Sequence, residues 1–262
     1  MIEIVSWGLS GSLVDLGHRG RSWLGAPRGG AVDIAALSLA NRLVGNPSDA
    51  VGVESSGGLA LRILEPAMVA VAGAVTHCVV DDGPPLGWGS PVVLPSGATV
   101  RLGRPLVGMR TYVAVRGGLF GSTTQLGVGP DPRTPAATEP APLWTPSDTI
   151  AIWPGPRLDH FELDTWHRLL SFGFEVTDTS RVGVRLRGPG LRSTGSASLP
   201  SEGVLEGAVQ VPPDGRPIVM LADHPTTGGY PVVAVVNPDD IATVAQAAPG
   251  DHLRFRSAVP PG

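Results

Sequence analysis

Glycine and proline interrupt this sequence so often that few segments are long enough for a helix of several turns. The 262 residues include 36 glycines and 27 prolines. Both types are unfavourable inside helices and common in turns, so they divide the chain into many short segments. Four segments are rich in β-branched residues and bounded by turn residues, which is typical of strands. They are MVAVAGAV (68–75), TYVAVRGG (111–118), PIVMLAD (217–223) and PVVAVV (231–236). The pattern predicts a mainly β protein with a few helices.

Three segments carry the start and stop signals of helices. Asp33 can cap the first helix and Gly45 can end it, while Asn237 and Pro238 form a typical helix start. The segments are 33–45, 158–173 and 237–246.

A Pro-rich stretch divides the chain into two β-rich parts. Residues 126–148 lack periodic apolar spacing, so we interpret them as an extended connection. The expected modules are therefore 1–125 and 149–262. PSGATVRL (95–102) and APGDHLRF (248–255) share a Gly turn before a strand, which favours two domains of similar plan; chance similarity of hairpins is the alternative.

Composition excludes several functions. The formal net charge is −4, which provides no general attraction to nucleic acid or to an anionic membrane. All 19 basic residues are Arg, so the chain has no Schiff-base Lys, no biotin-carrying Lys and no Walker A Lys. No HxxxH or CxxC spacing is present, so we expect no metal site made by this chain alone.

Cys78 is the single cysteine, so no intrachain disulfide can form, and its Val neighbours predict a buried structural thiol. The N-terminal residues have no basic region followed by a long apolar run, and no segment is apolar enough to span a bilayer. We expect a soluble cytoplasmic protein.

The stretch LADHPTTGGYP is the strongest candidate site in the sequence. Asp223 and His224 could move protons, and the following hydroxyls and glycine amides could hold an anion or a developing oxyanion. The glycines permit a positive φ and a close approach of the ligand. The residues assigned here are Asp223, His224, Thr226, Thr227, Gly228, Gly229 and Tyr230. A tight structural turn is the alternative interpretation.

Other polar residues are candidates for binding the substrate. Arg181 and Arg185 carry planar guanidinium groups that suit a carboxylate or phosphate, unless they form surface salt bridges. Glu202 and Gln210 are polar residues among apolar ones and could equally brace the backbone. In the first half, the candidates are Asp15, Asn41 and Arg42.

Taken together, the motifs resemble the KipA family, known also as allophanate hydrolase subunit 2, biotin-dependent carboxyltransferase or the C subunit of 5-oxoprolinase. The resemblance covers almost the whole chain. It is carried by GGAVD (29–33), LANRLVGN (39–46), GMRTYVAVRGGL (108–119), WPGPRLDHF (153–161), SRVGVRLRG (180–188), SEGVLEGAVQVPPDGRPIVMLADHPTTGGYP (201–231) and AQAAPGDHLRF (245–255).

The resemblance implies two β-barrel-like modules of cyclophilin-like type. It also implies a KipI-like sister subunit, a possible third 5-oxoprolinase-type subunit and the use of ATP by the complex, with no covalent biotin on this chain. The expected activity is ATP-dependent cleavage of 5-oxoproline to glutamate. Two alternatives stay open: a carboxyltransferase subunit of a urea carboxylase or allophanate hydrolase-type system, and a regulatory protein that only binds its partner.

The chain departs from the family pattern at several positions. Val14 stands where the family usually has Gln, His18 replaces an Arg, and Pro225 replaces a Gln in the Asp-x-x-Thr-Thr-Gly-Gly-Tyr motif. GVGPD (127–131) replaces a stretch that is usually Ser-Arg-Ser-Thr. These departures leave open whether the substrate is altered or the activity lost.

Overall fold

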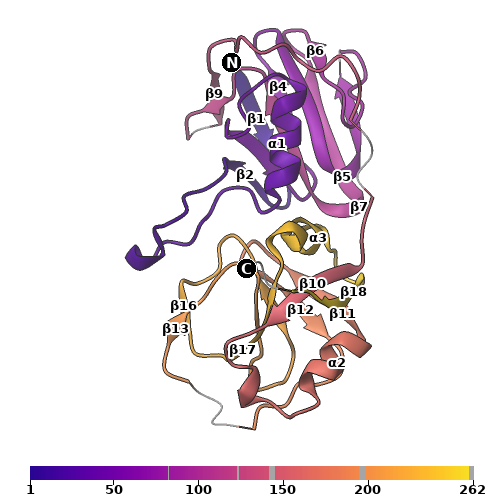
Figure 1. Cartoon of the computed structure of the whole chain (residues 1–262). Coiled ribbons are helices and arrows are strands. Elements are labelled where there is room, and N and C mark those ends of the chain that lie inside the picture. The colour runs from indigo at the N-terminus through magenta and orange to yellow at the C-terminus, as the bar shows by residue number, and fades with distance from the viewer. Residues whose placement is uncertain (82, 123, 142–144, 195–198, 260–262) are drawn as a thin grey trace. The chain divides into compact units, whose positions relative to one another are not determined.

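The computed structural model describes residues 1–81, 83–122, 124–141, 145–194 and 199–259 (Figure 1). The chain divides into two compact units. The first consists of Met1–Gly17 with Asp33–Thr145, and the second of His18–Val32 with Pro146–Gly262. The expected ranges 1–125, 126–148 and 149–262 differ from these units mainly because the segment 18–32 belongs to the second unit.

The first unit is built on a nine-stranded sheet with the order β2-β3-β7-β4-β1-β9-β8, in which β5 pairs with β6 and β7. The strands are β1 (Ile2–Ser6), β2 (Gly11–Val14), β3 (Gly52–Ser55), β4 (Ala60–Ile63), β5 (Ala67–Asp81), β6 (Val92–Leu94), β7 (Thr99–Val115), β8 (Leu119–Phe120) and β9 (Gln125–Val128). The long strands β5 and β7 pair antiparallel from Val69↔Val115 to Asp81↔Thr99. Together they form the frame of this unit.

Helix α1 (Ile34–Leu43) begins as the sequence predicts, because the Asp33 side chain accepts a hydrogen bond from the Ala36 amide at 2.9 Å. The buried phenol of Tyr112 donates to Glu54 Oε2 at 2.7 Å and accepts from the Asp33 amide at 2.8 Å. Burial and the nearby Glu54 carboxylate raise the pKa of Tyr112 well above its ordinary value. The phenol therefore stays protonated and links the helix start to the sheet.

The expected connection 126–148 begins too early, because its first three residues belong to β9, which pairs with β1 and β8. The rest of the stretch is fixed to the first unit. The Arg116 guanidinium pairs with Asp131 and donates to the carbonyls of Pro132 at 2.7 Å and Thr134 at 3.1 Å. Among the described residues of 129–148 there is no helix or strand. The Arg116 side chain thus donates hydrogen bonds to several backbone carbonyls.

The second unit is a closed seven-stranded barrel with the order β10-β17-β14-β15-β12-β11-β18. Its strands are β10 (Thr149–Pro154), β11 (Gly173–Thr179), β12 (Gly183–Arg187), β14 (Ala208–Gln210), β15 (Ile218–Met220), β17 (Val232–Val236) and β18 (His252–Ser257). Parallel pairing of β10 with β18 closes the barrel, and β13 (Glu202–Gly203) with β16 (Thr227–Gly228) forms a separate two-stranded sheet. The prediction of a mainly β fold with two barrel-like modules is confirmed, the first being nearly closed.

The prediction of one helix over 158–173 is wrong. The segment contains a 3-10 turn, η2 (Leu158–His160), and a shorter helix, α2 (Thr165–Ser171). Phe161 interrupts them because it forms a β-bridge with Ser193. The helix predicted over 237–246 is confirmed in place, starting as η3 (Pro238–Asp240) and continuing as α3 (Ile241–Gln246). Among the described residues, no helix has the length and apolar character that a membrane span requires.

Residues 18–32 are attached to the barrel by backbone and core contacts. The Gly29 amide donates to the Ala222 carbonyl at 3.0 Å. Val32 is 1% exposed and belongs to the same apolar cluster as Phe174 and Phe255. An N-terminal segment thereby becomes part of the wall around the C-terminal loops.

Candidate functional site

The candidate loop 223–230 forms one side of the two-stranded sheet. Glu202 lies opposite Gly228, and Gly203 lies opposite Thr227. The Val204 amide extends this pairing by donating to the Thr226 carbonyl at 3.0 Å. The structure thus brings Glu202 to the Thr-Thr-Gly-Gly stretch, although the two are well separated in sequence.

Gly228 and Gly229 do not adopt the positive φ that we expected for an anion-binding nest, since neither is among the glycines with left-handed backbone. Gly228 is instead needed for close packing: a Cβ there would lie 3.0 Å from Gln210 Nε2 and 3.3 Å from a Val204 methyl. The Gln210 side chain is buried, and its amide donates to the Tyr230 carbonyl at 3.3 Å. Gln210 therefore braces the loop from the barrel side.

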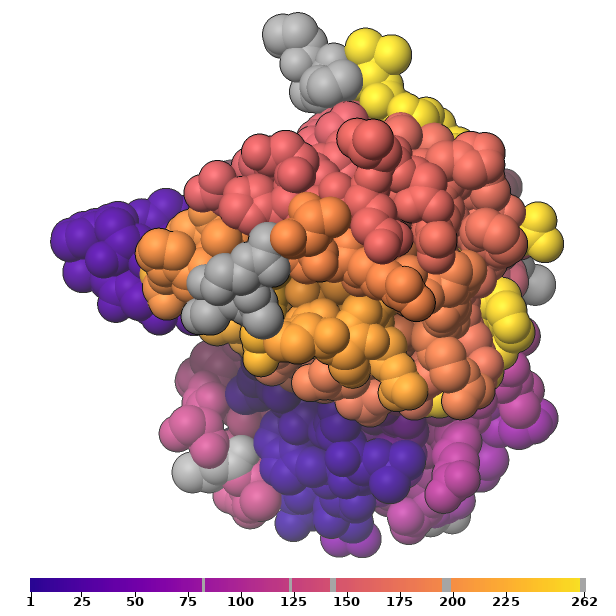
Figure 2. Space-filling view, turned by 90° about the horizontal axis from the view of Figure 1, so that it is seen from below, coloured from indigo at the N-terminus to yellow at the C-terminus, as the bar shows by residue number. Residues whose placement is uncertain are grey.

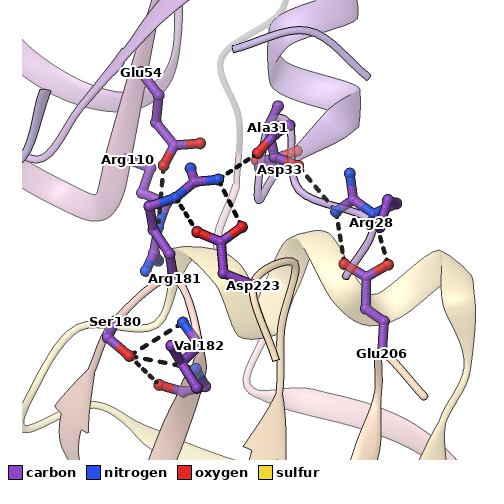
Figure 3. A network of polar contacts seen from close by, with 12 residues as sticks. Arg28, Ala31, Asp33, Glu54, Arg110, Ser180, Arg181, Val182, Glu206 and Asp223 are labelled. Atoms are coloured by element: carbon purple, nitrogen blue, oxygen red, sulfur yellow. Dashed lines mark hydrogen bonds and ion pairs between the residues drawn. The ribbon is translucent and has the colours of Figure 1, made fainter. Parts of the chain in front are cut away.

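Asp223 is held by Arg181 (Figure 3). The guanidinium donates from Nε to Oδ2 at 2.7 Å and from Nη2 to Oδ1 at 3.2 Å. Arg181 Nη2 also donates to the Gly30 carbonyl at 2.6 Å. Because both carboxylate oxygens accept hydrogen bonds from one guanidinium, this arrangement favours a positioning role for Asp223. Arg181 joins the 223–230 loop to the 18–32 segment.

Two further Arg–carboxylate pairs stabilise the same region. Arg157 Nη2 donates to Glu202 Oε2 at 2.7 Å, and this hydrogen bond raises the pKa of Arg157. Arg28 donates to Glu206 through Nε at 2.9 Å and Nη2 at 2.6 Å (Figure 3). Sequence reasoning missed Arg28, because its partner Glu206 lies 178 positions further along the chain.

A polar pocket of about 290 Å³ lies where the 18–32 segment meets the barrel loops. The polar residues of its lining are His18, Arg19, Ser22, Arg28, Glu206 and His224. The Arg28–Glu206 pair forms one wall, and Val204, Leu205 and Ile241 add apolar surface. Its residues all come from the second unit.

His224 is the titratable candidate that this arrangement leaves available. It is 4% exposed, and its Nδ1 contacts the Pro225 carbonyl at 2.8 Å. A carbonyl only accepts hydrogen bonds, so Nδ1 carries the proton and Nε2 of the neutral ring is a proton acceptor. The loop thus presents a buried imidazole in a defined tautomer at the pocket.

Other predicted site residues have different surroundings. Arg185 is exposed on β12, between the buried residues Val184 and Leu186, so its side chain points away from the barrel interior. In the first unit, Asp15 accepts from the Gly17 amide at 2.7 Å, and the buried Asn41 donates to the Ala50 carbonyl at 2.7 Å. Arg42 is exposed on α1.

Tyr230 and Thr227 are exposed, and Thr226 is half-buried. Within the described residues, no group of three or more His, Cys, Asp or Glu side chains could hold a metal ion.

Two barrel-like β units, the second carrying a loop of Thr and Gly next to a buried imidazole, make up the described structure. The family described as carboxyltransferase domain, subdomain A and B, matches residues 24–127 and 120–257. The chain belongs to this family.

Three individual proteins are similar to this chain in sequence. The chain is 30% identical to the 5-oxoprolinase C subunit of Escherichia coli K12, over 97% of this chain and 90% of that protein. It is 27% identical to the corresponding 5-oxoprolinase C subunit of Haemophilus influenzae, over 98% and 91%. The urea amidolyase of Lachancea kluyveri is 26% identical, over 97% of this chain but 17% of its own length.

Solved structures agree with this fold. The crystal structure of TTHA0988 matches 98% of this chain with a TM-score of 0.86 and 32% identity. The K. lactis urea amidolyase matches 97% with a TM-score of 0.86 and 24% identity, a likeness of fold alone. The chain spans 55% of the TTHA0988 chain and 18% of the amidolyase chain.

Proposed function

We propose that this chain is one subunit of a hetero-oligomeric, ATP-dependent 5-oxoprolinase. The reaction converts 5-oxoproline, ATP and water into glutamate, ADP and phosphate. The observation that carries the proposal is the match to the C subunit of 5-oxoprolinase along nearly the full length of both proteins. The proposed partners are a KipI-like sister subunit and a third, 5-oxoprolinase-type subunit, and the proposed location is the cytoplasm.

The pocket beside His224 supports this proposal through its chemistry. Cleavage of a lactam needs a group that accepts a proton from the attacking nucleophile and returns it to the leaving nitrogen. The Nε2 atom of His224 is suited to that task because the Pro225 carbonyl fixes the other ring nitrogen as the donor. Arg19 adds a cation at the same pocket, which suits the carboxylate of 5-oxoproline.

The three ion pairs support a framework that holds these groups in place. Arg28 with Glu206, Arg157 with Glu202 and Arg181 with Asp223 each join segments that are distant in sequence. Each cation faces one carboxylate, so the Arg28–Glu206 pair, which lines the pocket, adds little net charge to it. We assign them to positioning, and we assign proton transfer to His224.

ATP is a substrate of the proposed assembly, and we assign its binding to another subunit. This chain has no lysine and no Walker A loop. In the pocket, Arg28 already binds Glu206, which leaves Arg19 as the remaining arginine of the lining for an anion. One cation fits a single carboxylate better than it fits a triphosphate.

A carboxyltransferase role is the second candidate. The family description and the similarity to urea amidolyases over almost this whole chain favour it. In that case a carboxyl group, and not water, would be transferred at the same pocket, with carboxybiotin supplied by another protein because this chain has no lysine to carry it.

The reaction product distinguishes the 5-oxoprolinase role from the carboxyltransferase role. The three subunits are co-expressed and purified as a complex, and glutamate formation from 5-oxoproline and ATP is measured. We expect glutamate from the full complex and none when this chain is omitted. Formation of an intact complex that makes no glutamate, but consumes carboxybiotin in the presence of urea or another amide, would support the second candidate instead.

A further inference from the structure

The segment 18–28, here called the arm, has a turn at its tip that exposes two large apolar side chains. In the turn η1 (Ser22–Leu24), Trp23 is 81% exposed and Leu24 is 62% exposed. In Figure 1 the turn lies at the far end of the indigo loop between β2 and α1, and in Figure 2 the same segment is the indigo group of atoms. Tryptophan is seldom so exposed, and exposed apolar groups of this size often mark interaction sites.

The tip is an ordered turn. The Leu24 amide donates to the Arg21 carbonyl at 2.9 Å, and the Gly25 amide donates to the Ser22 carbonyl at 2.9 Å. Gly25 ends the turn with a φ of 77°, a conformation that glycine adopts without strain. These hydrogen bonds define the turn that presents Trp23 to solvent.

The base of the arm is also fixed. The His18 amide donates to the Arg28 carbonyl at 2.8 Å, which joins the two ends of the arm. Arg28 is anchored to Glu206, and the next residue, Gly29, donates to the Ala222 carbonyl. A rigid base lowers the entropy that the arm loses when it binds a partner.

The charge of the arm indicates what kind of surface it fits. No Asp or Glu occurs between Asp15 and Asp33, although the whole chain has a net charge of −4. Arg19 and Arg21 are exposed, and within the described part of the chain neither has an ion-pair partner. Arg19 lines the pocket beside His224, whereas Arg21 does not, so the indole with the Arg21 guanidinium nearby suits an apolar pocket with an acidic rim.

We propose that residues 18–28 form a docking arm, which inserts Trp23 and Leu24 into an acidic-rimmed apolar pocket on another subunit of the assembly. The counterpart of this chain makes up 55% of the TTHA0988 polypeptide, so in that relative a further large part is covalently joined to it. The partner that binds the arm is then the subunit that corresponds to this further part of TTHA0988. Only this identity of the partner rests on the proposed function.

Docking has a consequence for the pocket. His18, Arg19 and Ser22 belong to the arm and also line the pocket beside His224. A partner that binds the tip therefore comes to lie next to the pocket. The position of the bound arm then sets the positions of those three residues. Binding of the partner would thus complete the site that this chain forms in part.

The test measures the affinity of this chain for the purified partner by calorimetry. We expect Trp23→Ala to weaken binding at least about 10-fold, as for an interface hot spot. Arg21→Glu should weaken binding and reverse the effect of added salt on the affinity. Leu163→Ala is the matched control, because Leu163 is 105% exposed elsewhere on the same unit and should bind within about twofold of the wild type.

Several outcomes would overturn the proposal. Unchanged affinity of Trp23→Ala, or the absence of any complex between the wild-type subunits, would each contradict it. Trp23-dependent dimers of this chain alone would overturn the choice of partner and identify a second copy as the occupant. A complex that depends on Trp23 but makes no glutamate would refute the proposed function and leave the docking arm supported. Unchanged circular dichroism and melting temperature of each variant would show that the fold is intact.

Discussion

Gly228 shows how one residue in the Thr-Thr-Gly-Gly stretch serves the fold of the site. Its missing side chain leaves room for the buried Gln210 amide, whose Nε2 lies 3.0 Å from the position of a Cβ. We expect Gly228→Ala to lower the free energy of unfolding by about 1–3 kcal/mol, because the buried Gln210 and Val204 side chains must shift. Urea unfolding followed by circular dichroism measures this loss.

The opposite strand offers a matched control. A Cβ on Gly203 would meet no atom within 4 Å, so Gly203→Ala should change the free energy of unfolding by no more than about 0.5 kcal/mol. Equal effects at both positions would show that packing against Gln210 and Val204 does not require glycine at position 228.

Cys78 provides a test that depends on pH. Burial raises the pKa of the Cys78 thiol from 9.0 to about 11. The native state therefore favours the neutral thiol, and the stability that this contributes is lost as the pH rises from 9 toward 11. At pH ~8, alkylation of the native protein by iodoacetamide should be about 100-fold slower than that of free cysteine, because the thiolate is the reactive form. Cys78 is half-buried, so the prediction of a buried thiol is only partly met. Mass spectrometry over time measures the rate, and a rate equal to that of free cysteine would contradict the raised pKa.

Among the elements of the first unit, Arg116 explains why the Pro-rich stretch is extended but fixed. It donates to the Val44, Pro132 and Thr134 carbonyls while pairing with Asp131. Arg116→Lys keeps the charge but removes the planar set of donors. We expect hydrogen exchange of the backbone amides in 133–141 to become at least about 10-fold faster, because local opening then costs less free energy, whereas the control Arg133→Lys should leave it unchanged. Equal exchange in both variants would show that Arg116 does not hold the segment.

Much of the element pattern could be predicted from the sequence, because local signals determine it. The four β-branched runs all contain strands, and the caps at Asp33 and Asn237 both start helices. The prediction for 158–173 is wrong since its interruption depends on a bridge from Phe161 to the distant Ser193. Local helix signals cannot reveal a contact between residues that are far apart in sequence.

The candidate site was predictable in part for the same reason. The motif around His224 is contiguous and could be found, but the partners of its side chains could not. Arg181 pairs with Asp223 across 42 positions, and Arg28 pairs with Glu206 across 178. The sequence shows only that the backbone of Gly228 could adopt a positive φ. In the structure φ is not positive, and glycine is needed there because Gln210 and Val204 pack against it.

Across the whole molecule, the segment 18–32 unites the candidate site. It leaves the first unit after Gly17, contributes Arg28 and Gly30 to the polar contacts of the second unit, and returns at Asp33. A boundary drawn from composition could not anticipate this, because Gly and Pro are common on both sides of it. The site of the second unit therefore depends on residues from distant parts of the chain.

The proposed function depends above all on His224 acting in 5-oxoproline cleavage by the assembled complex. The most direct test is the rate of 5-oxoproline-dependent ADP release by assemblies that contain wild-type chain or His224→Asn. Asparagine can keep the donor to the Pro225 carbonyl while removing Nε2, so we expect an intact complex with a rate lowered at least about 100-fold. An unchanged rate in His224→Asn, or no ADP release that depends on 5-oxoproline in the wild-type complex, would contradict this role of His224.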